Sequence, residues 1–485
     1  MSLLPAAHPR TPFAIPIWVI GAAIALLAAL GLGDPTPEHR LMLGGMLGAG
    51  VLVATALAPL TGYLVLAASC VMMVVVSVGT GEHNVMPFDV LLLPLIAGAV
   101  LAWITRRPPL AVDVPAPAGT ALGDLQRATR RFTDGAWLYA AVGLGSLFVT
   151  VLMGEAHGAL DSGFKLARAV EGMLMFGVGM ACVRDERAVG KLGGALVAGG
   201  VLFAAVNFAA LALQPLTSDN TIRRAGMTWF VNEPGWSIAD PNEAGIALLL
   251  LWAVLMGRQI HRPRLFGWLM MALTLGLLVL TQSRSSLLAW LTFTVLTWRQ
   301  LPRRALVFGA VAMLVAAPFV TTVWWTRMAR TVSGDRGSFE MYTTLVRVYG
   351  WWAAGRMFLG HPLVGVGYLG FRHFSDRYNE LGLVLGTCES FFLETATGMG
   401  IVGLFVFFRA LWRTAVLGDV VAKHAPQGSL AATLARLHKP YLIALMVSNL
   451  TGDNWTGLVG LAQTAVWCLL LVRAGQFAVS GRTEP

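Results

Sequence analysis

The sequence predicts an all-α polytopic membrane protein. Of its 485 residues, 56% are hydrophobic and only 12% are charged, whereas soluble domains carry about 25% charged residues. Apolar runs recur at about 20 residues each, the length of a helix that crosses a hydrocarbon core. These runs are continuous rather than alternating, which disfavours a β-barrel. We therefore expect about 12–14 transmembrane helices with one large loop that carries short amphipathic helices.

Residues 1–214 form the first group of predicted transmembrane helices. The opening stretch MSLLPAAHPRTPFAIP lacks a convincing cleavage site and is interpreted as a cytoplasmic tail. A stretch at 105–134 contains RRPP, PAPAG and QRATRR and is predicted to be a flexible basic loop. The expected helices lie at 13–32, 41–58, 63–80, 86–104, 135–153, 164–182 and 192–214.

Residues 215–410 form the predicted functional core. A polar loop at 215–241 precedes a helix at 242–256, whose start is marked by Asp240 and Pro241. The region 266–298 has two short apolar halves around TQSRSS, which is compatible with a broken or re-entrant pair. Two further helices, at 305–322 and 389–408, enclose the large loop at 323–388.

Residues 411–485 complete the chain with further transmembrane helices and a tail. A basic loop leads to a short apolar run at 440–450 and then to a final helix at 456–472. Most lysines and arginines fall on the side of the two termini, so both termini are predicted to be cytoplasmic and the large loop to face outward. This topology explains the net charge of +10 better than nucleic-acid binding does.

The large loop contains seven arginines and four tryptophans. Its segment TLVRVYGWWAAGRMFLG has the mixed pattern of a helix lying on a membrane surface, with Arg347 and Arg356 on the polar side. Trp351 and Trp352 could be interfacial anchors or a stacking surface for sugar rings. The following HPLVGVGYLGF predicts a glycine-rich turn that permits close backbone approach.

Several charged residues at membrane depth are candidate functional residues, because such charges are costly there. Arg284, in TQSRSS, either extends to the lipid headgroups or marks an anion site at a helix N-terminus. Arg223 and Arg224 are either solvated loop charges or partners of the same anion. Glu389 could be a helix-start carboxylate, and Glu394, one turn deeper, could pair with an arginine. No spacing typical of metal ligands is present in the sequence, so neither metal nor cofactor is expected.

These features in this order resemble the O-antigen ligase and polymerase family. The resemblance covers about residues 220–410 and comprises DPNEAGIALLL, TQSRSSLLAW, the outward loop with Arg347 before HPLVGVGYLGF, and a final signature. In the family this signature begins with His and has Gly seven residues after a Leu. Here it begins with Glu389 and has Leu393 and Gly400.

The resemblance implies a bacterial inner-membrane glycosyltransferase of GT-C-like type, with its active site at the periplasmic face. Its implied partners are the lipid bilayer and an undecaprenyl-diphosphate-linked oligosaccharide as both donor and acceptor, with a chain-length regulator as a further candidate. The family arginines that hold the diphosphate correspond to Arg224, Arg284 and Arg347. In the ligases the His is thought to deprotonate the acceptor, and its replacement by Glu389 favours a polymerase over a ligase.

The residues themselves are compatible with this chemistry. Arginine binds phosphate oxygens bidentately and stays charged, while an ionised glutamate can accept a proton from a sugar hydroxyl. The sequence therefore predicts a metal-independent, inverting polymerase of an exopolysaccharide or O-antigen, with Glu389, Arg284 and Arg224 as catalytic residues. The alternatives are ligation to lipid A-core or a protein, and, in another class, an anion or glycan transporter. A transporter would be expected to show two similar halves, and no internal repeat is evident.

Overall fold

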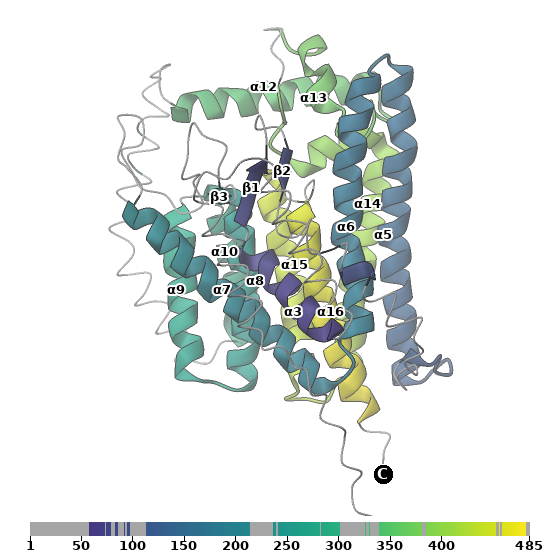
Figure 1. The fold of residues 1–485 in the computed structure, drawn as a ribbon. Helices are drawn as coiled ribbons and strands as arrows, with labels where there is room; N and C mark the ends of the chain where they lie inside the picture. Colours follow the sequence, from purple (N-terminus) through teal and green to yellow (C-terminus); the bar gives the residue numbers. More distant parts are fainter. Residues whose placement is uncertain are drawn as a thin grey trace, which may run out of the picture.

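The fold is a bundle of long helices with one helix lying across an end (Figure 1). A computed structural model describes residues 58–72, 74–78, 83–85, 92, 95–97, 113–213, 236–238, 241–281, 283–300, 325, 329, 339–380, 385–452, 455 and 458–481. The prediction of an all-α polytopic membrane protein is confirmed. In the part of the chain so described, six helices are long and apolar enough to cross a membrane, namely α5, α7, α8, α14, α15 and α16.

The described helices fall into three groups along the chain. Before the large loop they are α3 (Pro59–Met72), α5 (Ala121–Leu152), α6 (Ala156–Cys182), α7 (Glu186–Leu213), α8 (Pro241–His261), α9 (Leu265–Thr281) and α10 (Arg284–Thr297), which ends in the 3-10 turn η2 (Trp298–Gln300). The loop contributes α12 (Phe339–Gly360), α13 (Phe371–Phe374) and the 3-10 turn η3 (Ser375–Arg377). The last three are α14 (Phe391–His424), α15 (Leu430–Leu450) and α16 (Leu458–Ser480).

A small antiparallel sheet, which the sequence patterns did not predict, joins distant parts of the chain. Its strands are β1 (Val74–Val78), β2 (His83–Val85) and β3 (Trp236–Ile238), in the order β2-β1-β3. Val76 lies opposite both Val85 and Trp236. The prediction of one helix over 63–80 is therefore wrong after Met72. The β-branched run VVVSV explains the strand, because such residues favour extended backbone.

Two predicted basic loops are helical instead. α5 begins at Ala121, where the Thr120 side chain accepts a hydrogen bond from the Gly123 N–H, so residues 121–134 are not a flexible loop. α14 likewise continues past residue 408 to His424. Asp124 lies 3.2 Å from Nε2 of His424 at this end of both helices. The two polar helix ends support each other, which the apolar patterns alone do not reveal.

Several predicted helices cannot be compared with the structure. The runs at 13–32 and 305–322, and nearly all of 41–58 and 86–104, lie outside the described residues. The final helix is longer than predicted, because α16 continues from 472 to Ser480. Its Arg473 is fully buried and reaches Oδ1 of Asp113 at 2.7 Å and Oε1 of Gln476 at 2.8 Å. A buried charge of this kind requires such partners.

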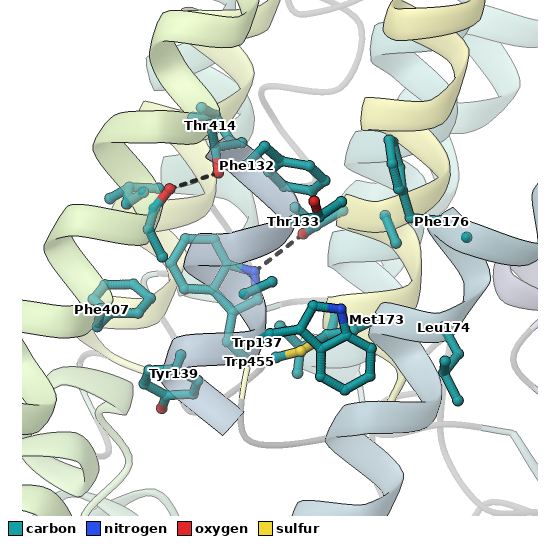
Figure 2. A pocket seen from close by; sticks show the side chains of 18 of the residues that line it. Phe132, Thr133, Trp137, Tyr139, Met173, Leu174, Phe176, Phe407, Thr414 and Trp455 are labelled. Carbon is teal, nitrogen blue, oxygen red and sulfur yellow. Dashed lines mark hydrogen bonds between the residues drawn. The ribbon is translucent and has the colours of Figure 1, made fainter. Parts of the chain in front are cut away.

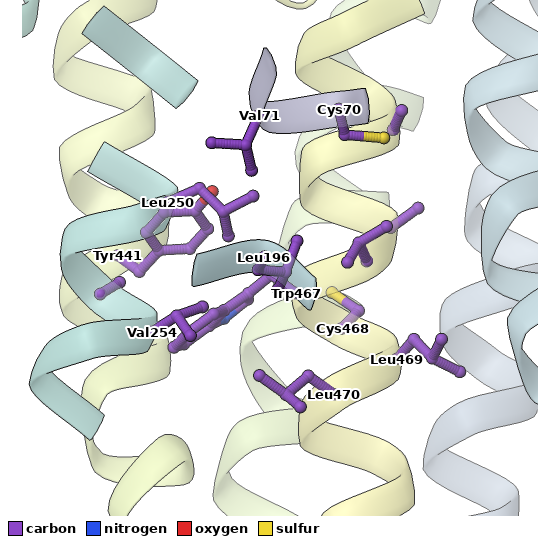
Figure 3. Close-up of a cluster of buried hydrophobic side chains, with 14 of the residues drawn as sticks. Cys70, Val71, Leu196, Leu250, Val254, Tyr441, Trp467, Cys468, Leu469 and Leu470 are labelled. Atoms are coloured by element: carbon purple, nitrogen blue, oxygen red, sulfur yellow. The ribbon is translucent and has the colours of Figure 1, made fainter. Parts of the chain in front are cut away.

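The core lies around α8 and α16, whose side chains are buried along most of their length (Figure 3). One buried polar side chain in this core, His438, has both of its ring nitrogens hydrogen-bonded, as burial favours. Nδ1 of His438 accepts a hydrogen bond from the Trp467 indole N–H at 2.9 Å, and Nε2 therefore donates to the Thr414 carbonyl at 2.7 Å. These contacts join α14, α15 and α16 inside the bundle.

Hydrogen bonds define which helix ends lie together. Ser283, before α10, bonds Asn242 at the start of α8, so α8 and α10 begin at the same end of the bundle. His261, the last residue of α8, bonds Gly428, before α15, so α15 runs in the opposite direction and finishes at that first end. The Phe391 N–H then donates to the Gly452 carbonyl at 2.9 Å, which places the start of α14 there too. We call this the loop end.

Candidate functional site

An ion pair between Arg347 and Glu389 is the centre of the candidate site. Nη2 of Arg347 lies 3.4 Å from Oε2 of Glu389, and the two side chains are 26% and 29% exposed. Arg347 belongs to α12, which lies across the loop end (Figure 1), and Glu389 lies just before α14. Because both side chains are half-buried, the carboxylate is held in place and still accessible to a substrate.

Glu389 is presented by an unusual turn. Its φ of +53° is in the left-handed region, which non-glycine residues rarely adopt. The Glu389 N–H donates to Oγ1 of Thr387 at 3.0 Å, which stabilises this conformation. α14 begins at Phe391 after Ser390, so Glu389 is not the helix-start residue that the sequence suggested. Strained backbone of this kind often occurs at functional sites.

Glu394 is buried one turn into α14, with 4% of its surface exposed. Its Oε1 accepts a hydrogen bond from the Cys388 N–H at 3.0 Å. The sequence suggested an arginine as partner, whereas this contact is to the backbone of the turn that carries Glu389. A backbone donor cannot be recognised from residue types, which is why the sequence did not reveal it.

Arg284 is the first residue of α10 and its side chain is exposed. Ser283 caps the helix by accepting from the Ser286 N–H, and Oγ of Ser283 donates to Oδ1 of Asn242 at 2.6 Å. The N-termini of α8 and α10 are therefore fastened together at the loop end, where their N–H groups favour an anion. The predicted break at TQSRSS is confirmed. Arg284 shares this end of the bundle with Arg347 and Glu389.

The other predicted site residues are placed differently. Arg223 and Arg224 lie outside the described residues. Trp351 and Trp352 lie on the exposed face of α12 and are 42% and 58% exposed. The Arg356 guanidinium lies 5.9 Å from the ring centroid of Trp352 and 3.6 Å from Glu380, in both cases at the surface. The role of the tryptophans as anchors or as a sugar surface stays a prediction.

α14 is broken at Gly400, where φ is +63° and ψ is −159°. The segment 362–367 from the glycine-rich stretch fills the break. Its backbone forms hydrogen bonds with backbone N–H and carbonyl groups on both sides of Gly400. The Ile401 N–H donates to the Pro362 carbonyl at 2.8 Å, and the Val366 and Gly367 N–H groups donate to the carbonyls of Thr397 and Gly398 at 2.8 and 2.7 Å. We call residues 362–367 the strap. It confirms the close backbone approach predicted for this stretch.

The break turns the first two helical turns of α14 back onto the rest of the helix. The rings of Phe391 and Phe407 are 4.9 Å apart, although the residues are 16 positions apart in sequence, and a straight helix would separate them by roughly 24 Å. The short segment 391–399 is therefore a re-entrant piece. It carries Glu389 and Glu394 into the loop end, and Gly400 of the family signature is the residue that permits this.

A charged seam attaches α13 and η3 to the beginning of α6. Arg372 lies 3.1 Å from Asp161, and Arg377 lies 2.9 Å from Glu155. Nε2 of His373 is 3.7 Å from Asp161. Burial lowers the pKa of His373 below its usual range, and Arg372 lowers it further, against the opposing effect of Asp161. The sequence patterns did not indicate this seam, because its partners are more than 200 residues apart.

An apolar cavity of about 170 Å³ opens between α5, α6, α14, α15 and α16 (Figure 2). Phe391, two residues after Glu389, lines it together with Tyr139, Phe407 and Trp455. The Trp455 indole N–H donates to Oγ1 of Thr464 at 3.3 Å, so this polar group is already satisfied. The lining suits a hydrocarbon chain rather than a sugar.

A comparison with known families identifies the region that contains this site. Residues 269–408 match the family described as O-antigen ligase. We refer to residues 269–408, which this match covers, as the O-antigen ligase domain. The match confirms the resemblance seen in the sequence for α9, α10, α12, α13 and the first half of α14, and it includes Arg284, Arg347, Glu389 and Gly400. Residues 220–268, which the resemblance also covered, lie outside the match. No curated protein matches the chain.

The O-antigen ligase domain contains the centre of the candidate site. The order of its elements brings two arginine-bearing helices and a carboxylate to one end of the bundle. Among the described residues, no three His, Cys, Asp or Glu side chains come together as a metal site would require. The charged groups described at the centre of the candidate site are guanidinium and carboxylate groups.

Proposed function

We propose that this protein is a glycosyltransferase that polymerises undecaprenyl-diphosphate-linked repeat units of an O-antigen or exopolysaccharide. The observation that carries the proposal is the accessible Arg347–Glu389 ion pair inside the O-antigen ligase domain. Arg284 at the start of α10 adds a second guanidinium at the same end of the bundle. We further propose that the loop end faces the periplasm of the bacterial inner membrane and that both termini are cytoplasmic.

In the proposed reaction, Glu389 is the base. An acceptor sugar hydroxyl transfers its proton to the Glu389 carboxylate while its oxygen attacks the anomeric carbon of the donor. A new C–O bond forms, the bond from that carbon to the diphosphate oxygen breaks, and the lipid diphosphate leaves with the bonding electrons. A single base and a direct attack predict inversion at the anomeric carbon.

The arginines stabilise the leaving group in this proposal. Arg347 and Arg284 bind diphosphate oxygens through their planar guanidinium groups. Stabilisation of the developing charge in this way often contributes more to catalysis than any other effect. Arg224 remains a predicted third partner and Arg223 a predicted neighbour. Arg347 has a second role, since its contact with Glu389 offsets the negative charge that the base brings toward an anionic donor.

The apolar cavity supports a lipid carrier as the donor. Phe391 lines it and is separated from Glu389 by Ser390 alone. A hydrocarbon chain can therefore enter between the helices while its head group lies near the ion pair. This arrangement favours a lipid-linked glycan over a soluble nucleotide sugar.

Ligation is the second candidate function. It is favoured by the description of the matched family as O-antigen ligase, whereas the replacement of the family His by Glu389 favours polymerisation. In a ligase, the same chemistry would transfer the finished glycan once to lipid A-core or to a protein.

The test is a reaction of the purified protein with lipid-linked oligosaccharide extracted from the cells that carry it. Polymerisation produces a ladder of lipid-linked products, while ligation produces one transfer to an added acceptor. A single product that forms only with lipid A-core or protein would replace the polymerase by a ligase. Retained anomeric configuration in the product would overturn the direct displacement. Absence of any glycan transfer would overturn both functions.

A further inference from the structure

We propose that Glu394 is a positioning residue, whose buried carboxylate holds the 387–390 turn so that Glu389 meets Arg347. The inference rests on the proposed function, in which Glu389 is the base. Oε1 of Glu394 accepts from the Cys388 N–H at 3.0 Å, and both residues are almost completely buried. A carboxylate inside the protein requires partners of this kind, and this one acts on the residue directly before the base.

The turn needs such support because its conformation is unfavourable by itself. Glu389 has a φ of +53°, a conformation that persists only where the surroundings enforce it. Two side chains enforce it here. Thr387 accepts from the Glu389 N–H at 3.0 Å, and Glu394 accepts from the Cys388 N–H. Without these two acceptors the turn could relax to an ordinary backbone conformation and point Glu389 elsewhere.

The same turn also positions the arginine. A Cβ placed on Gly350 of α12 would lie 3.3 Å from Cα of Cys388, so α12 packs directly on the residue that Glu394 holds. Arg347 lies one helical turn before Gly350, on the part of α12 that reaches Glu389. Displacement of Cys388 would therefore change both sides of the Arg347–Glu389 pair. Glu394 controls the pair through the backbone and does not need to touch the substrate.

The test compares two substitutions at this position. Glu394→Gln keeps an acceptor oxygen of nearly the same shape and should retain kcat within about threefold. Glu394→Leu removes the acceptor and should lower kcat by about 10–100-fold with KM little changed, because a displacement of about 1 Å can cost that much. The assay uses the purified full-length protein and the extracted lipid-linked oligosaccharide. Equal kcat for the Leu variant and the wild type would overturn the inference.

A double-mutant cycle with Glu389→Gln separates positioning from a general loss of structure. If Glu394 acts mainly through Glu389, Glu394→Leu should have a clearly smaller effect once Glu389 is Gln, with only the part that acts through Arg347 remaining. A loss of the same size in both backgrounds would show an independent role and overturn the inference. If Glu389→Gln alone keeps near-normal turnover, the assignment of Glu389 as the base is wrong. If Glu389→Gln loses turnover but Glu394→Leu keeps it, only the positioning role of Glu394 is wrong.

A second pair of variants tests the turn should Glu394→Leu fail to fold. Thr387→Val removes the hydroxyl that accepts from the Glu389 N–H, and Thr387→Ser keeps it. Thr387 is only half-buried, so folding of its variants should be preserved. We expect about a tenfold loss of kcat for Val and near wild-type kcat for Ser. Wild-type kcat for both variants would show that the turn does not need side-chain support.

Discussion

Replacement of Gly400 by alanine should destabilise the O-antigen ligase domain strongly. Gly400 has φ +63° and ψ −159°, a region of backbone conformation that is essentially restricted to glycine. A Cβ at this position would lie 2.3 Å from the Leu363 carbonyl oxygen and 2.6 Å from the Val364 nitrogen. Both are backbone atoms of the strap, so they cannot move aside as a flexible side chain could.

The expected loss has two physical causes. An alanine in this conformation costs about 1–3 kcal/mol. Displacement of the strap also weakens its hydrogen bonds to Thr397, Gly398, Ile401 and Val402, each of which contributes about 0.5–1.5 kcal/mol. If half of these bonds are lost, the free energy of unfolding falls by roughly 2–6 kcal/mol in total. At about 2–4 °C per kcal/mol, the Tm should fall by about 4 °C at least and by about 24 °C at most.

The assay is thermal unfolding of the purified protein in detergent, followed by tryptophan fluorescence. Gly276→Ala is the matched control, because Gly276 lies within α9 and a Cβ there meets nothing within 4 Å. It should unfold within about 2 °C of wild type, since alanine is the better helix former. If Gly400→Ala unfolds together with this control, the break and the strap do not support the domain as described.

Three further predictions concern charge. Arg347→Ala should lower kcat by about 10²-fold. Arg347→Lys should have an intermediate kcat, because it keeps the charge but loses the planar guanidinium group. Equal kcat for the wild type and both variants would exclude a role for the guanidinium group. Burial lowers the pKa of His373, so the docking of α13 to Asp161 is favoured above the usual His pKa of about 6.5 and weakens as the pH falls below that value. The amide exchange rates of residues 371–377, corrected for intrinsic rates, should therefore rise when the pH is lowered from 7.5 to 5.5. They should not rise in His373→Gln. In that His373→Gln background, turnover should persist down to about pH 5 if Glu389 is the base; a fall below about pH 6.5 would indicate an imidazole base instead.

The parts of the fold that local chemistry determines were predictable. Pro241 starts α8 and Arg284 starts α10 as proline, serine and polar-turn patterns indicate. The glycines at 365 and 367 have positive φ and approach other backbone closely, as their stretch HPLVGVG suggested. Each of these features depends on residues within a few positions of one another, which is the range over which sequence patterns are informative.

The break in α14 depends on contacts that no local pattern contains. The sequence predicts one helix over residues 389–408, which are mostly apolar after Glu394, and a glycine in such a run ordinarily lies within an unbroken helix. The strap that fills the break comes from more than 30 positions earlier. For the same reason, Glu394 could be recognised as exceptional but not as the partner of the Cys388 N–H. The helical extension at 121–134 was missed because its partner, His424, is 300 residues away.

The central claim is that arginines from separate helices gather around one lipid diphosphate beside the carboxylate of Glu389. A cryo-EM map of the protein in lipid nanodiscs with undecaprenyl diphosphate bound tests this most directly. We predict the diphosphate at the loop end, in contact with the guanidinium groups of Arg284 and Arg347 and next to Glu389, with the first isoprene units toward Phe391. Density for the diphosphate at the opposite end of the bundle, or away from both arginines, would contradict this claim.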